Sequence, residues 1–195
     1  MTRLSLLVPV VLLAGCAPVS SGSQPQTATS APAATSTSTS ASGTATAPGW
    51  TVPTQKVSVP HDPAVPPVPV LVEVRAGDHA DDGYERVTFA FRGPLPSYTF
   101  QIVPQVTRDG SGDPVTLPGA TFLSIVFTPA RSEAGTGPRA VGYRRVRGYE
   151  QVGDYEGYVS YGIGLNSPDG ATVQVRTGES TRADGTNVVA LDIKV

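Results

Sequence analysis

From residue 68 onward, apolar and polar residues alternate along this 195-residue chain, and that period of two constrains the fold more than any other feature. Valines occupy every second position from Val68 to Val74, and Val87, Phe89 and Phe91 repeat the pattern. Successive side chains of a β-strand point to opposite faces, so such alternation is typical of strands with one buried face. Residues 67–195 are therefore predicted to form an all-β domain.

Seven apolar segments are expected to supply the strands of a β-sandwich. They are residues 68–74, 87–91, 98–102, 122–127, 159–165, 173–175 and 189–195. Segment 122–127 is apolar on both faces, as expected of a central strand. Asp-Gly pairs at 109–110, 169–170 and 184–185 favour tight hairpin turns. We expect seven or eight strands in two packed, mainly antiparallel sheets, with almost no helix.

The first residues have the pattern of a bacterial lipoprotein signal. Residues 1–15 contain Arg3, an apolar run and then small residues, as secretory signal peptides do. The Leu-Ala-Gly-Cys sequence that ends at Cys16 resembles a lipobox, in which the thiol receives a diacylglycerol before cleavage leaves the cysteine first. The alternative is an ordinary signal peptide followed by a free thiol. We predict lipidation at Cys16 and an anchor in the outer face of the cytoplasmic membrane.

Residues 16–66 are predicted to be a disordered tether between this anchor and the domain. Residues 17–49 are almost entirely Ser, Thr, Ala and Pro, and carry no charge. Such a segment buries too little apolar surface to offset its chain entropy. From Trp50 onward proline becomes frequent, which favours extended conformers. The expected organisation is a signal peptide (1–15), a tether (16–66) and one domain (67–195).

Composition excludes several functions. Cys16 is the only cysteine, so disulfides, thiolate metal sites and a cysteine nucleophile are not expected in the domain. The formal net charge of −2 does not favour nucleic acid as a partner. The only histidines, His61 and His79, lie in the tether and in a loop, where neither is placed to activate a serine. We expect no cofactor, no metal and no catalytic residue.

Two acidic groups nevertheless admit a second interpretation. The loop at 78–82, with Asp78, His79, Asp81 and Asp82, contains types of side chain that bind divalent cations, although turn hydrogen bonds are the plainer interpretation. The acidic residues of segment 150–156 could form a carboxylate pair for glycoside hydrolysis, or merely provide surface charge.

Four stretches of the domain carry a family resemblance. They are VEVRAGDHADDGYERVTFAFRG (72–93), PLPSYTF (94–100), RDGSGDPVTLPG (108–119) and DYEGYVSYGIGL (154–165). Together they closely resemble the AMIN-like domain of actinobacterial lipoproteins. In this resemblance, residues 84–91 match a strand that begins with tyrosine, an acid and arginine, and residues 158–165 match a strand that ends in Ile-Gly-Leu. Segment 178–187 departs from the family, whose last strand follows a shorter turn with proline.

The resemblance implies a β-sandwich that targets proteins to the cell envelope and is not an enzyme. The expected ligand is peptidoglycan or another wall glycan. An adaptor that docks a wall enzyme or secretion component is the alternative, and a wall hydrolase is a third.

Arginines and tyrosines gather between residues 139 and 161, and five of the seven tyrosines of the chain lie there. Guanidinium groups suit carboxylates or phosphates, and tyrosine rings suit sugar faces. We single out Arg144, Arg145, Arg147, Tyr155 and Tyr158 as candidate ligand contacts. The alternative interpretation places Tyr161 in the core, Tyr155 and Tyr158 at a sheet edge, and the arginines in a solvated loop.

Replacement Cys16→Ala is predicted to leave the protein without lipid and its precursor uncut after Gly15, because the thioether is what the lipoprotein peptidase would recognise. Mass spectrometry of the membrane fraction measures both. An unmodified thiol on wild-type Cys16 would contradict the lipoprotein assignment.

Overall fold

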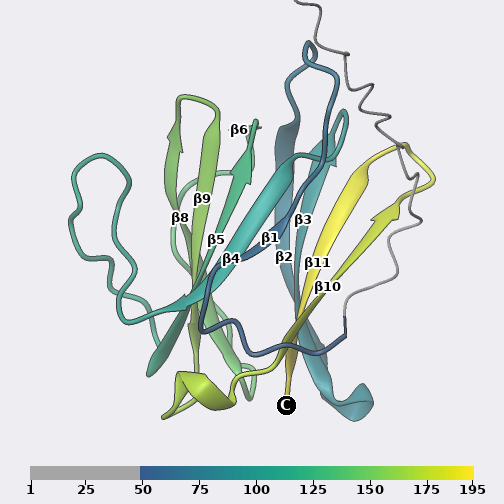
Figure 1. Ribbon diagram of the computed structural model, residues 1–195. Coiled ribbons are helices and arrows are strands. Elements are labelled where there is room, and N and C mark those ends of the chain that lie inside the picture. The colour runs from purple at the N-terminus through teal and green to yellow at the C-terminus, as the bar shows by residue number, and fades with distance from the viewer. Residues whose placement is uncertain (1–48) are drawn as a thin grey trace, which may run out of the picture. The chain divides into compact units, whose positions relative to one another are not determined.

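The computed structural model describes residues 49–195, which fold into a sandwich of two β-sheets (Figure 1). The signal peptide, Cys16 and tether residues 16–48 lie outside the described residues. Two three-residue 3-10 helices, η1 (Ala80–Asp82) and η2 (Gly170–Thr172), are the helical elements of the described part. None of its helices has the length and apolarity to cross a membrane.

Sheet A has five strands in the order β10-β11-β3-β2-β6. Their bounds are β2 Val70–His79, β3 Tyr84–Arg92, β6 Arg131–Ser132, β10 Val175–Thr181 and β11 Asn187–Lys194. The short β6 pairs with β2 in parallel, and every other pair of this sheet is antiparallel.

Sheet B has six strands in the order β1-β4-β5-β9-β8-β7, all antiparallel. Their bounds are β1 Val57–Val59, β4 Ser97–Val103, β5 Thr121–Thr128, β7 Arg139–Ala140, β8 Val146–Tyr155 and β9 Tyr158–Leu165. The predicted all-β sandwich of mainly antiparallel sheets is confirmed, but eleven strands replace the expected seven or eight.

Alternating apolar residues place one face of each long strand in a shared core. In β5 the buried positions are every second residue, including Leu123, Ile125 and Phe127. The Phe127 ring lies 4.9 Å from the Phe89 ring centroid of the opposite sheet, and Phe89 in turn lies 5.4 Å from Tyr161. Aromatic pairs at these separations hold the two layers together. Burial raises the pKa of the Tyr161 hydroxyl to about 12.

A fully buried carboxylate ties sheet A to the start of β8. Glu85 of β3 accepts hydrogen bonds from the backbone nitrogens of Arg145 (2.9 and 3.0 Å) and Val146 (2.5 Å). A buried carboxylate is tolerated when N–H donors replace its water. This explains the acid of the Tyr-Glu-Arg motif: Glu85 points into the sandwich and fixes the chain that enters β8.

The predicted tether ends earlier than expected. Residues 50–59, here called the N-terminal strap, run along the sandwich. Thr51 exchanges backbone hydrogen bonds of 2.9 and 2.7 Å with Val175 of β10, and β1 pairs with β4. Val57 and Val59 pack against the core. Assigning residues 50–59 to the tether was therefore wrong, because their few apolar side chains and backbone groups complete the edges of both sheets.

Two further predictions were wrong in detail. Segment 146–155 was not among the expected strands, yet it forms the ten-residue strand β8. The Asp169-Gly170 pair forms no hairpin turn, because the Asp169 carboxylate accepts a 2.8 Å hydrogen bond from the Ala171 amide and caps η2. The pair at 184–185 does lie in the hairpin between β10 and β11, with Gly185 at φ 81°.

Shortening the strap valines is predicted to destabilise the domain. Val57→Ala and Val59→Ala each remove two partly buried methylene equivalents, which should lower the free energy of unfolding by about 1 kcal/mol. Denaturant melts measure this loss. Val65→Ala is the control, since its side chain is 50% exposed and should change stability little. Equal stability of all three variants would contradict the contribution of the strap.

Candidate functional site

The structure does not bring the predicted arginine and tyrosine contacts together. Arg144, Arg145 and Arg147 lie at the start of β8, whereas Tyr155 ends that strand and Tyr158 begins β9. Tyr155 lies eight residue steps along the strand from Arg147, which is about 26 Å at about 3.3 Å per step. The two halves of the predicted window therefore lie at opposite ends of sheet B.

Two of the three arginines bind the protein itself. Arg145 donates from Nε to the Lys194 carbonyl and from Nη1 to the Asn166 carbonyl, both at 3.2 Å. Arg147 donates to the Tyr143 carbonyl at 3.1 Å. The residue Arg144 is exposed. The side chains of Arg145 and Arg147 thus hold neighbouring loops in place. Arg144 is the arginine of this group that is exposed and could contact a ligand.

The tyrosines divide in the same way. Tyr143 and Tyr149 donate to carbonyls of β2 at 3.2 and 3.1 Å, and Tyr161 is buried in the core. Tyr155 and Tyr158 face each other across the β8–β9 hairpin, and are 71% and 50% exposed. This pair stays a candidate contact surface.

The acidic candidates do not converge. Glu150 is buried and accepts a 2.7 Å hydrogen bond from Arg108, while Asp154 accepts from the Ser132 amide and Glu156 lies in the hairpin turn at φ 50°. In segment 78–82, the Asp78 carboxylate accepts a 2.9 Å hydrogen bond from the Ala80 amide. This contact agrees with the interpretation of these residues as turn formers. Within residues 49–195 no three His, Cys, Asp or Glu side chains gather as metal ligands would.

The outer face of sheet B is covered by the chain. Residues 104–119, here called the cover loop, project beside this sheet between β4 and β5 (Figure 1). Val106, Val115 and Leu117 of the cover loop form a second apolar cluster with Val152 of β8. The part of that face formed by β8 and β9 is therefore already occupied by the protein.

Glycines make this coverage geometrically achievable. A Cβ on Gly162 of β9 would stand 2.6 Å from the Val106 side chain, and one on Gly164 would stand 2.0 Å from the Pro118 carbonyl oxygen. A Cβ on Gly153 of β8 would meet the Asp109 carboxylate at 1.9 Å. In the Ile-Gly-Leu motif, Ile163 and Leu165 thus point into the core, and Gly164 between them leaves room for the cover loop on the outer face.

The outer face of sheet A carries a row of charged and aromatic side chains. Arg176 of β10, Asp192 of β11 and Arg86 of β3 are neighbours across three strands, and Trp50 of the strap stands beside Arg176. We call these four residues the arginine row. Gly178, on the edge strand β10 of this face, has nothing within 4 Å of its Cβ position. This face is open where the other is covered.

Asp192 holds the two guanidinium groups in place. Arg86 donates to it from Nε at 2.6 Å and from Nη2 at 3.0 Å, and Arg176 donates from Nε at 2.8 Å. The Asp192 side chain is only 4% exposed, against 32% and 36% for the arginines. The hydrogen bond to Asp192 raises the pKa of Arg86, with burial opposing it.

Aromatic rings flank the guanidinium groups. The Arg176 guanidinium carbon lies 4.7 Å from the Trp50 ring centroid and 5.1 Å from that of Tyr84. Arg86 lies 5.0 Å from the Tyr84 ring, and His79 stacks on Tyr84 with centroids 5.0 Å apart. Cation–π contacts of this kind fix the orientation of the arginines. The tyrosine and arginine of the Tyr-Glu-Arg motif thus belong to the outer face.

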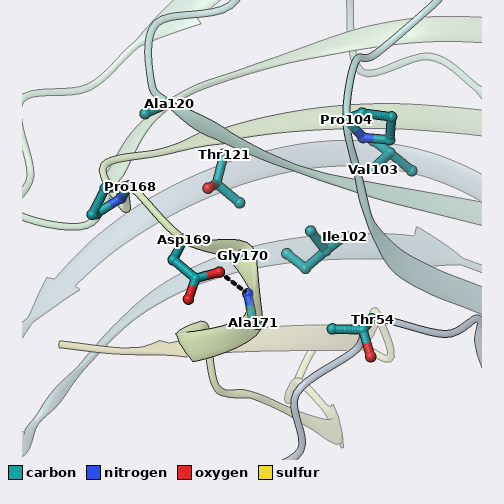
Figure 2. A pocket seen from close by; sticks show the side chains of 10 residues that line it. All are labelled: Thr54, Ile102, Val103, Pro104, Ala120, Thr121, Pro168, Asp169, Gly170 and Ala171. Carbon is teal, nitrogen blue, oxygen red and sulfur yellow. Dashed lines mark hydrogen bonds between the residues drawn. The ribbon is translucent and has the colours of Figure 1, made fainter.

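A pocket of about 330 Å³ opens at the arginine row. It is lined by Gly49, Trp50, Arg86, Arg176, Thr177, Gly178 and Asp192. A pocket of about 360 Å³ lies elsewhere, between the strap, the β4 and β5 ends and η2 (Figure 2). Its one ionisable side chain, Asp169, caps η2 through Ala171, as the dashed line in Figure 2 shows. The pocket at the arginine row has the stronger charge.

A family model describes most of the domain. The AMIN-like domain model matches residues 69–193. The chain belongs to the AMIN-like domain family. AMIN-like domains are extracytoplasmic envelope domains that generally bind or scaffold rather than catalyse. No curated protein and no solved structure matches the chain.

Crowding the cover loop is predicted to destabilise the AMIN-like domain. Gly164→Ala places a Cβ against the Pro118 backbone, and overpacking of this kind should cost about 1 to 3 kcal/mol and free residues 104–119 for proteolysis. Limited proteolysis and denaturant melts measure both effects. Gly178→Ala in β10 is the matched control and should leave both unchanged. Equal behaviour of the two variants would contradict the packing of the cover loop on sheet B.

Proposed function

We propose that this protein is a lipoprotein, anchored through Cys16 to the outer face of the cytoplasmic membrane, whose AMIN-like domain binds a wall glycan or peptidoglycan without catalysis. The family match over residues 69–193 supports an envelope role. The Leu-Ala-Gly-Cys sequence supports the anchor, and the composition of residues 17–48 supports a tether that lets the domain reach the wall.

The outer face of sheet A is the proposed binding face. The observation that carries this choice is the contrast between the two outer faces: the cover loop packs on sheet B, whereas sheet A presents Arg86, Arg176 and Trp50 beside an open pocket. Wall polymers combine sugar rings with anionic groups, and arginine with aromatic rings suits both. Arg144 stays a further proposed contact at the periphery.

A role without catalysis is favoured by the placement of the reactive groups. Glu150 is neutralised by Arg108, and the His61 ring lies 3.0 Å from Glu179 in a contact that closes the edge between the two sheets. Ser97 hydrogen-bonds the backbone of His61 and not its ring, and among the described residues neither histidine ring hydrogen-bonds a hydroxyl that it could activate for nucleophilic attack.

A protein-docking role is the second candidate. The large apolar side chains that are most exposed in the described part are Val65, Val68, Tyr155 and Tyr158. Hydrogen bonds from Ala130 to Gly157 and from Arg131 to Pro69 place the β8–β9 turn close to the segment before β2. This end of the sandwich is suited to a wall enzyme or secretion component, with Tyr155 and Tyr158 as the proposed contacts.

The full chain in nonionic detergent is predicted to co-sediment with purified cell wall, less strongly as salt rises, because charged contacts are screened. Replacement of both Tyr155 and Tyr158 by Ala should leave wall binding intact if sheet A is the binding face. The same double variant should lose a protein partner from envelope extract if the docking role holds. Absence of wall binding by wild type at low salt would contradict the proposed function.

A further inference from the structure

Both arginines of the arginine row line the pocket and keep guanidinium nitrogens that Asp192 does not bind. Asp192 occupies Nε and Nη2 of Arg86 and Nε of Arg176. Among residues 49–195, Nη1 of Arg86 and both Nη atoms of Arg176 have no hydrogen-bond acceptor. These nitrogens belong to side chains that are about one third exposed, so water or a ligand can reach them.

The charges of the row do not cancel. Two guanidinium groups face one carboxylate, and Lys194 adds a third cation, with its Nζ 5.8 Å from the Trp50 ring centroid. Asp192 thus orients the arginines and leaves a net positive charge at the pocket. A fixed fork of N–H donors suits two oxygens of one carboxylate or phosphate, because parallel charge-assisted hydrogen bonds are short and directional.

Small residues keep the pocket open beside the row. On the same face, the next residue after Arg176 along β10 is Gly178, and the next residue before Asp192 along β11 is Ala190, which pairs with Gly178. Nothing lies within 4 Å of the Gly178 Cβ position. Trp50 provides a flat apolar wall. A ligand that carries an anionic group on a ring, such as an acidic sugar, matches the positive charge, the space beside Gly178 and the flat Trp50 side chain.

We propose that Arg86 and Arg176, held by Asp192 beneath Trp50, form a subsite for a carboxylate or phosphate group carried by a saccharide. This assignment rests on the proposed function for its biological ligand, but the anion chemistry follows from the pocket itself. The anion would accept hydrogen bonds from Nη1 of Arg86 and from the Nη atoms of Arg176, and the saccharide would lie toward Gly178.

Trp50 provides a direct optical test, because it is the only tryptophan of the chain. The full chain in nonionic detergent is titrated, at constant ionic strength, with D-glucuronate, with glycerol phosphate and with neutral D-glucose. At least one of the two anions should change Trp50 emission saturably, and glucose should not. The anion that binds more tightly identifies whether a carboxylate or a phosphate is the natural group.

Three variants separate a binding role from a structural one. Arg176→Gln and Gly178→Leu should each weaken anion binding at least tenfold by calorimetry. The first variant removes hydrogen-bond donors. The second fills the pocket with a leucine side chain and leaves Asp192 and its ion pairs intact. Arg75→Gln is the matched control, because Arg75 lies on the same face but pairs with Glu73 away from the pocket. Circular dichroism verifies that each variant is folded.

Two results would overturn the subsite: no saturable response to either anion, or equal anion affinity in wild type, Arg176→Gln and Gly178→Leu. Wall sedimentation is measured in parallel. Anion binding without wall binding would support the subsite and reject the proposed wall ligand. Wall binding without anion binding would reject the subsite and leave the proposed function in place.

Discussion

Close approach of the cover loop to the glycines of β8 and β9 determines which surface of this domain is free. A methyl group at Gly162 or Gly164 would collide with Val106 or with the Pro118 backbone. Because those positions are bare, residues 104–119 bury a second apolar cluster on sheet B and neutralise Glu150 through Arg108. The sandwich is therefore covered on one side, and its charged and aromatic side chains meet solvent on the other.

Contacts between distant segments then shape the open face. Glu85 holds the start of β8 against sheet A, while its neighbours Tyr84 and Arg86 point outward. The strap adds Thr51 to the edge of β10, which sets Trp50 beside Arg176. One short sequence motif thus serves the core and the surface at once. The strap, which precedes the family-matched residues, also supplies a wall of the proposed binding pocket through Trp50.

Sequence reasoning identified strands with regular alternation but missed those whose period is interrupted. β8 has register shifts between Val146 and Gly148 and between Gln151 and Gly153. Its residues under the cover loop mix glycines with Glu150 and Val152, so they show no simple alternation of apolar and polar side chains. β1 was not predicted because it lies in a proline-rich segment, where strands are uncommon. It has three residues, and its pairing with β4 cannot be read from the local sequence. The arginine row was missed because its four members come from three segments far apart in the chain, namely the strap, β3 and the β10–β11 hairpin, and only the Tyr-Glu-Arg motif marked one of them. The arginines and tyrosines of residues 139–161 are close together in the sequence, but β8 carries them to opposite ends of sheet B.

The proposed binding of ligands to the open outer face of sheet A is tested most directly by hydrogen–deuterium exchange of the full chain, with and without soluble wall fragments. The account predicts slower exchange in residues 84–92, 175–181 and 187–194 and in the strap near Trp50, with residues 104–119 unchanged. Protection confined to the cover loop or to the β8–β9 hairpin would contradict it.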